Sequence, residues 1–120
     1  MMFINLSNHP SDKWSIKQTE CAKAYGELVD MPFPKIDPYG TDEYINGLVQ
    51  EYFEKIVAYD TCVVMVQGEY LFTYRLVCKL KEAGIKVLAG CSERRTIEYV
   101  DENGFTDRRS EFEFVDFKEY

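Results

Sequence analysis

Apolar residues along the chain form short continuous runs that alternate with longer segments of helical periodicity. The runs cover residues 2–6 (MFINL), 27–31 (ELVDM), 61–66 (TCVVMV) and 85–90 (IKVLAG), and runs of this length predict buried strands. Between them, apolar positions at helical spacing predict helices over about 12–25, from Thr41 to about Val57, and over about 70–83. Alternating strands and helices favour an α/β fold with a mainly parallel sheet and flanking helices, in which 61–66 is the central strand.

Local signals mark where these helices begin and end. Ser15 and Gln18 have the spacing of a capping box at a helix start. Gly26 and Gly84 lie where a helix often ends in a left-handed residue. The segment 32–40 contains three prolines, which predict a loop.

After Gly90 the pattern changes to two strand-like runs joined by Asn103-Gly104. That dipeptide predicts a β-hairpin with a type I′ turn, in which both central residues have positive φ. The apolar alternation slips by one residue near 114–115, which indicates a β-bulge. We therefore expect a C-terminal antiparallel β-hairpin on a single domain spanning residues 1–120.

Composition restricts the classes of function. The chain has 21 Asp and Glu against 14 Lys and Arg, and its net charge of -7 disfavours binding to long nucleic acid. No apolar stretch approaches membrane-spanning length and the N-terminal residues lack the pattern of a signal peptide, so a cytoplasmic protein without membrane contact is expected. One histidine and four dispersed cysteines predict no metal site and no cofactor.

Ligands of open parallel sheets bind beyond the carboxyl ends of the strands. This rule selects three polar segments: Ser7–His9 after the first strand, Gln67–Glu69 after the third, and Cys91–Arg95 after the fourth. His9 is either a proton carrier or an inert surface residue. Gly68 and Glu69 either form a tight turn at a helix start or admit a ligand phosphate there.

Four arginines lie in the two strands of the expected hairpin: Arg94, Arg95, Arg108 and Arg109. They are either solvated strand charges or an anion site in an acidic protein, and we expect the anion site.

Several segments together resemble a small family of CRISPR-associated proteins in the Csx series. They are FINLSNHPSDKWSIKQ at the start, VVMVQGEYLFTYRLV and IKVLAG in the middle, and SERRTIE and FEFVDFKEY near the end. The positions that match the family pattern are Ser7, His9, Gln18, Gln67, Gly68, Glu69, Tyr70, Thr73, Tyr74 and Arg94. Glu93 and the Arg94–Arg95 pair depart from it.

Such proteins are similar to CARF domains, which are Rossmann-like, and to ring nucleases, which linearise cyclic oligoadenylate second messengers. The resemblance implies a homodimer that cleaves cyclic tetra-adenylate without metal, leaving 2′,3′-cyclic phosphate ends. It implies catalytic roles for His9, Gln67, Glu69 and Arg94. It implies ligand contacts by Ser7, Gln18, Gly68, Tyr70, Thr73 and Tyr74. The segments at the strand ends add Asn8, Ser92 and Arg95 as expected ligand contacts. Two alternatives stay open: a binder that sequesters the nucleotide uncleaved, and a small α/β adaptor that binds protein.

Overall fold

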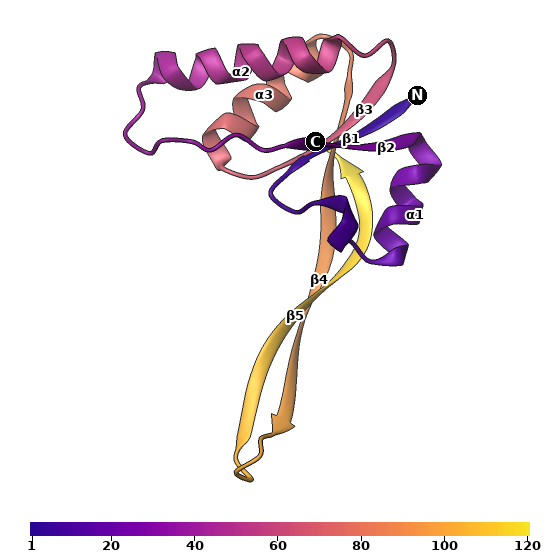
Figure 1. Cartoon of the computed structure of the whole chain (residues 1–120), viewed down its shortest axis with the longest axis vertical. Helices are drawn as coiled ribbons and strands as arrows, with labels where there is room; N and C mark the ends of the chain where they lie inside the picture. Colours follow the sequence, from indigo (N-terminus) through magenta and orange to yellow (C-terminus); the bar gives the residue numbers. More distant parts are fainter.

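The computed structural model describes all residues from 1 to 120 and has a five-stranded mixed sheet with three helices (Figure 1). In chain order the elements are β1 (Met2–Ser7), a 3₁₀ turn (Ser11–Lys13), α1 (Ile16–Tyr25), β2 (Glu27–Pro32), α2 (Asp42–Val57), β3 (Cys62–Gln67), α3 (Tyr70–Glu82), β4 (Lys86–Val100) and β5 (Thr106–Glu119). The strand order is β2-β1-β3-β4-β5, and only the β4–β5 pair is antiparallel. The α/β class, the mainly parallel sheet and the central position of the third strand are confirmed. The predicted end of the fourth strand at Gly90 is wrong: β4 continues to Val100, so residues 91–95 lie within a strand and pair with β5.

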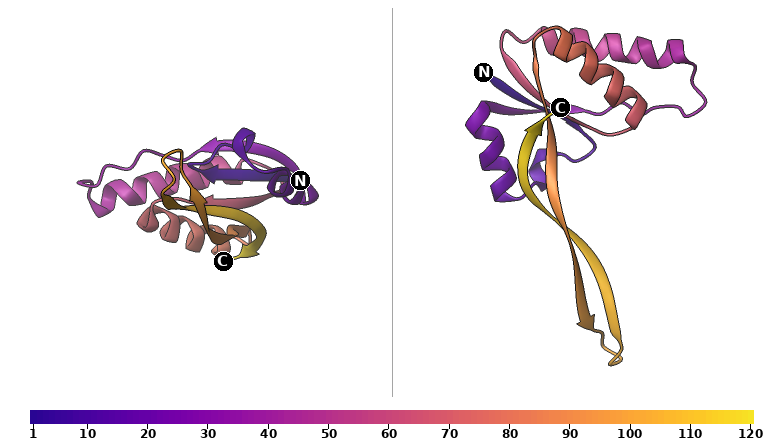
Figure 2. Two further views of the ribbon diagram at one scale, coloured as in Figure 1. Left: turned by 90° about the horizontal axis from the view of Figure 1, so that it is seen from below. Right: turned by 180° about the vertical axis from the view of Figure 1, so that it is seen from behind.

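The helices cover both faces of the sheet. Helices α2 and α3 lie together on one face, and α1 lies on the other (Figure 2). Side chains alternate accordingly along each strand: Ile4 and Leu6 pack under α2 and α3, whereas Phe3 packs with Trp14 and Phe117 on the α1 side. Burial on both faces explains why the inner strands β1 and β3 are mostly apolar.

Helix α1 begins at Ile16, later than predicted, because Ser11–Lys13 form a separate 3₁₀ turn. The predicted cap is confirmed: the Ser15 side chain accepts a hydrogen bond from the Gln18 N–H at 3.2 Å. The prediction for Gly26 is wrong, since its φ of 167° is extended backbone. Glycine is needed there because a Cβ would overlap the Met1 carbonyl oxygen.

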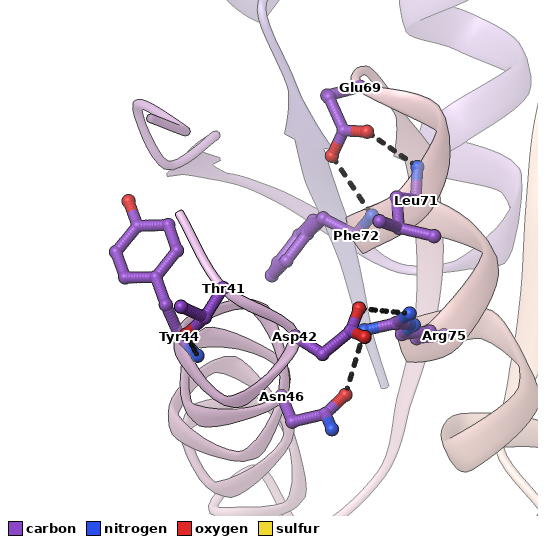
Figure 3. Close-up of polar contacts among 8 residues, drawn as sticks. All are labelled: Thr41, Asp42, Tyr44, Asn46, Glu69, Leu71, Phe72 and Arg75. Carbon is purple, nitrogen blue, oxygen red and sulfur yellow. Dashed lines mark hydrogen bonds and ion pairs between the residues drawn. The ribbon is translucent and has the colours of Figure 1, made fainter. Parts of the chain in front are cut away.

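Helices α2 and α3 are joined by polar contacts at their N-terminal ends. Figure 3 shows Arg75 of α3 donating to Asp42 at 3.0 Å and to Asn46 at 3.1 Å, both on α2. Gly84 ends α3 with φ of 78°, as predicted for a left-handed helix end.

The β4–β5 hairpin extends well beyond the layers of the domain (Figure 1). We call residues 93–113 the arm. It gives the molecule extents of 55 × 38 × 21 Å and a radius of gyration of 17.1 Å. A compact chain of this length has a radius of gyration of about 13–14 Å. The sequence predicted the hairpin but gave no indication that it projects from the body.

The turn of the hairpin differs from the predicted type I′ turn. Asn103 does not have positive φ, and only Gly104 in this loop does, at 81°. Asp101 organises the loop instead: its carboxylate accepts from the N–H groups of Asn103 at 2.9 Å and Phe105 at 3.0 Å. Its carbonyl accepts from the Gly104 N–H, so the connection is a longer loop with one left-handed glycine.

The predicted bulge is confirmed at Val115. Cys91 pairs with Asp116 while Ser92 pairs with Phe114, which leaves Val115 without a partner on β4. The extra residue returns Phe117 to the same face as Phe114, and both rings are buried against the α1 side of the sheet.

Gly26, which has no room for a side chain, and Gly47, which has room, provide a matched test of the close contact between Gly26 and Met1. Gly26→Ala should destabilise the fold by about 1–3 kcal/mol, because its methyl group has no room beside Met1. Gly47 lies at an exposed position of helix α2, and a Cβ there meets no atom within 4 Å. Gly47→Ala should therefore raise the free energy of unfolding by about 1 kcal/mol. Urea unfolding of both variants measures the difference, and a destabilised Gly47→Ala would contradict this account.

Candidate functional site

A cavity of about 1060 Å³ lies beyond the carboxyl ends of β1 and β3. After β1 the chain turns toward α1 on one face of the sheet, and after β3 it turns toward α3 on the other. In a parallel sheet such a divergence of neighbouring strands creates a crevice at the strand ends. Ser7 and Gln67 are paired residues at these two ends, and both line the cavity.

Ten of the thirteen predicted site residues line this cavity: Ser7, Asn8, His9, Gln18, Gln67, Gly68, Tyr70, Thr73, Tyr74 and Ser92. Three do not: Glu69, Arg94 and Arg95. The structure adds cavity residues that the sequence did not single out, and those used below are Lys13, Gly90, Phe112, Phe114 and Tyr120.

Glu69 caps helix α3 and does not enter the cavity. Its carboxylate oxygens accept from the N–H groups of Leu71 at 2.6 Å and Phe72 at 3.0 Å (Figure 3). The helix N-terminus is therefore occupied by a side-chain carboxylate, which leaves no place for the phosphate considered there. Gly68 is required for another reason, since a Cβ would overlap the Phe33 ring.

The arginines of the hairpin do not form a free basic cluster. Three of them are paired with carboxylates: Arg95 with Glu93 at 3.4 Å and Glu113 at 2.8 Å, Arg108 with Glu98 at 3.0 Å, and Arg109 with Glu111 at 3.0 Å. Arg94 differs, because its guanidinium donates to Ser110 Oγ at 3.1 Å and has no carboxylate within 4.0 Å. The expected four-arginine anion site is thus reduced to Arg94.

A buried asparagine holds the loop that carries His9. Asn5 is fully buried in β1, and its Nδ2 donates to the His9 carbonyl at 3.0 Å and to Asp30 Oδ1 at 2.9 Å. Its Oδ1 accepts from Ser7 Oγ at 2.6 Å, and Trp14 Nε1 donates to the same His9 carbonyl at 3.0 Å. The backbone of His9 is therefore held from several sides, at a position where the residue lines the cavity.

Asp30, at the carboxyl end of β2, completes this network. Its carboxylate accepts from the Ser11 N–H at 3.2 Å and from Ser11 Oγ at 3.0 Å. Sequence reasoning missed Asn5 and Asp30. The available signal was a polar Asn5 inside the apolar run 2–6, because a buried amide requires partners.

Gln67 has a defined orientation. Its Oε1 accepts from the Gly90 N–H at 2.8 Å, which leaves its amide nitrogen free to donate to a ligand. A Cβ on Gly90 would lie 2.9 Å from this oxygen, so glycine at 90 permits the contact.

Tyr120 closes the cavity beside Gln67. Its hydroxyl donates to the Val66 carbonyl at 2.6 Å. Burial, together with the nearby Cys91 thiol, raises the pKa of Tyr120 above its usual value. The phenol therefore stays protonated and remains a donor through the neutral range.

Thr73 has a buried hydroxyl without a partner. The residue is 8% exposed and belongs to the cavity lining, and its buried Oγ1 makes no hydrogen bond. A buried polar group of this kind costs free energy unless something satisfies it.

The charge of the lining is opposite to that of the protein. None of its 19 residues is acidic, although the chain has 21 Asp and Glu among 120 residues. Lys13 contributes a cation and His9 a titratable ring. Such a lining suits an anion with aromatic and hydroxyl groups.

Replacing Asn5 tests its role in holding the site. Asn5→Ala should lower the free energy of unfolding by about 1–3 kcal/mol, because Asp30 and the His9 carbonyl lose a buried donor. Asn8→Ala is the matched control, since no hydrogen bond of its side chain is present, and it should change stability by less than about 0.5 kcal/mol. Equal losses in the two variants, measured by urea unfolding, would contradict a special role for Asn5.

No helix is long and apolar enough to cross a membrane.

Comparison with known proteins identifies a family for nearly the whole chain. No curated protein matches the sequence. The model of the family described as "Uncharacterized protein MJ1673 family" matches residues 1–118. The chain therefore belongs to the MJ1673 family.

Proposed function

We propose that this protein is a ring nuclease with a CARF-like, Rossmann-like domain, which binds cyclic oligoadenylate and cleaves it to linear products with 2′,3′-cyclic phosphate ends. The observation that carries the proposal is the cavity lining: it contains no Asp or Glu although the chain is acidic, and it includes Thr73, whose buried hydroxyl has no partner. The ligand that we propose is cyclic tetra-adenylate, as the sequence resemblance implies.

The size and the side chains of the cavity fit such a ligand. Its volume of about 1060 Å³ slightly exceeds the range of about 300–1,000 Å³ that is usual for drug-sized ligands, as a ligand larger than a drug molecule requires. Tyr70 is 91% exposed and Tyr74 69% exposed, one helical turn apart on α3, and both line the cavity. Exposed aromatic faces suit unpaired bases, while amide and hydroxyl groups suit base edges and ribose.

The reaction is an in-line attack of a ribose 2′-oxygen on its adjacent phosphorus. The O2′–P bond forms, the P–O5′ bond breaks, and the 2′-hydroxyl proton leaves as the O5′ atom gains one from the site. His9 is the proton carrier, since the Glu69 carboxylate is engaged by two backbone N–H groups and lies outside the cavity. Gln67 and Thr73 orient the ribose, and much of the acceleration comes from this positioning.

Charge that develops on the phosphate needs a donor inside the cavity. Lys13 and the free amide nitrogen of Gln67 are in the lining, whereas Arg94 is not. We therefore assign the stabilisation of the reacting phosphate to Lys13 and Gln67 rather than to Arg94.

A homodimer belongs to this proposal. The cavity is open, and Tyr70, Tyr74 and Phe112 at its edge are largely exposed. A ring of four identical nucleotides has two-fold symmetry, so two copies related by a two-fold axis would enclose it with equivalent contacts.

The decisive experiment incubates the purified protein with cyclic tetra-adenylate and, separately, cyclic hexa-adenylate in EDTA. Linear products that carry a cyclic phosphate, identified by chromatography and mass, are the expected result. An intact ligand that raises Tm would indicate a sequestering protein. No cleavage and no Tm shift with either ring would overturn the nucleotide proposal.

His9 and Glu69 can be separated by their conservative variants. His9→Gln should lower the single-turnover cleavage rate by about 10²- to 10⁴-fold while ligand binding is retained. Glu69→Gln should lower Tm, because the helix cap is weakened, and leave the cleavage rate within a few-fold of the wild-type rate. The reverse pattern of rates would assign the proton transfer to Glu69.

Thr73→Val should weaken ligand binding without lowering the stability of the free protein. Valine has nearly the same shape and removes the unpartnered hydroxyl, so the free protein should be unchanged or more stable by about 1 kcal/mol. Affinity for the cyclic nucleotide should fall about tenfold, because a hydrogen bond in the complex is lost. Thermal unfolding and calorimetric titration measure the two effects, and unchanged affinity would remove Thr73 from the site.

A further inference from the structure

One face of the arm continues the wall of the cavity. In the β4–β5 register Ser92 pairs with Phe114 and Arg94 pairs with Phe112. Residues that are paired, or two apart on one strand, share a face of the ribbon. Ser92, Phe112 and Phe114 all line the cavity, so Arg94 lies on the same face, one pair farther from the body.

The two faces of the arm differ in chemistry at this point. Arg95 lies on the opposite face and is held by Glu93 and Glu113. Arg94 is the only arginine of the chain without a carboxylate within 4.0 Å. Its cross-strand neighbour Phe112 is 72% exposed, whereas phenylalanine side chains are usually buried.

We infer that Phe112 and Arg94 form a second nucleotide subsite at the rim of the cavity. The face of Phe112 stacks on a base and the Arg94 guanidinium binds the adjoining phosphate, while a neighbouring nucleotide occupies the inner cavity between His9, Gln67 and Thr73. This inference rests on the proposed function and deepens it: the site selects an oligonucleotide over a mononucleotide. No assigned role of the inner cavity residues depends on it.

The test compares ligands of increasing length. AMP and linear oligoadenylates of two, three and four nucleotides are titrated into wild-type protein, Phe112→Ala and Arg94→Gln. The matched controls are Arg95→Gln, on the opposite face, and Phe105→Ala, at the exposed tip of the arm. All four side chains are solvent-exposed, and Tm values establish that the variants are folded.

The wild type should bind the longer ligands progressively more tightly. Phe112→Ala and Arg94→Gln should each lose about tenfold in affinity for the tetranucleotide and keep the wild-type affinity for AMP. Arg94→Gln should also reduce the slope of log affinity against log salt by about 0.7, the value for one phosphate on a single strand. Both controls should behave as wild type at every length.

The outcomes separate this inference from the proposed function. If Phe112→Ala and Arg94→Gln bind every length as the wild type does, or if Arg95→Gln loses as much affinity as Arg94→Gln, the rim subsite is refuted while the inner site stands. If the wild type binds no linear oligoadenylate and neither cyclic ring, the proposed function fails, and the subsite fails with it.

Discussion

The divergence of the chain after β1 and β3 is the constraint on which the site depends. These strands are neighbours in the sheet, yet one leads to α1 and the other to α3 on the opposite face. The chain leaves the two strand ends in opposite directions, so Ser7 and Gln67 border a crevice there. Asn5 below it and Gly90 beside it then hold the two edges of the crevice in place through hydrogen bonds.

Local arrangement of charge overrides net charge in this molecule. Several carboxylates around the crevice and the arm are already engaged. Asp30 accepts from Ser11, Glu69 caps the start of α3, and four glutamates of the arm pair with its arginines: Glu93, Glu98, Glu111 and Glu113. None of these groups belongs to the cavity lining. An acidic chain can therefore present a neutral to basic pocket without an overall basic surface.

The sequence predicted the ends of β1 and β3 well because their apolar runs end where burial ends. Five of the cavity residues were predicted for this reason: Ser7, Asn8, His9, Gln67 and Gly68. Four others were predicted from the family resemblance instead: Gln18, Tyr70, Thr73 and Tyr74. The sequence placed the end of β4 wrongly, at Gly90 instead of Val100, because β4 continues as a solvent-exposed strand of the arm. Side-chain partners could not be predicted the same way. The pairing of Arg95 depends on strand register, and the role of Gly90 depends on a side chain 23 residues away. The extended Gly26 and the loop at Asp101 likewise depend on contacts that local propensity does not contain.

The projection of the arm also determines where this protein opens first. Beyond the buried pair Phe114 and Phe117, the two strands pair only with each other, and a two-stranded ribbon in water is marginally stable. Amide hydrogens of the arm should exchange with solvent while those of β1 and β3 stay protected. A ligand held by the base of the arm would order a segment that fluctuates in the free protein. The loss of conformational entropy would reduce the affinity below the value that the contacts alone would give.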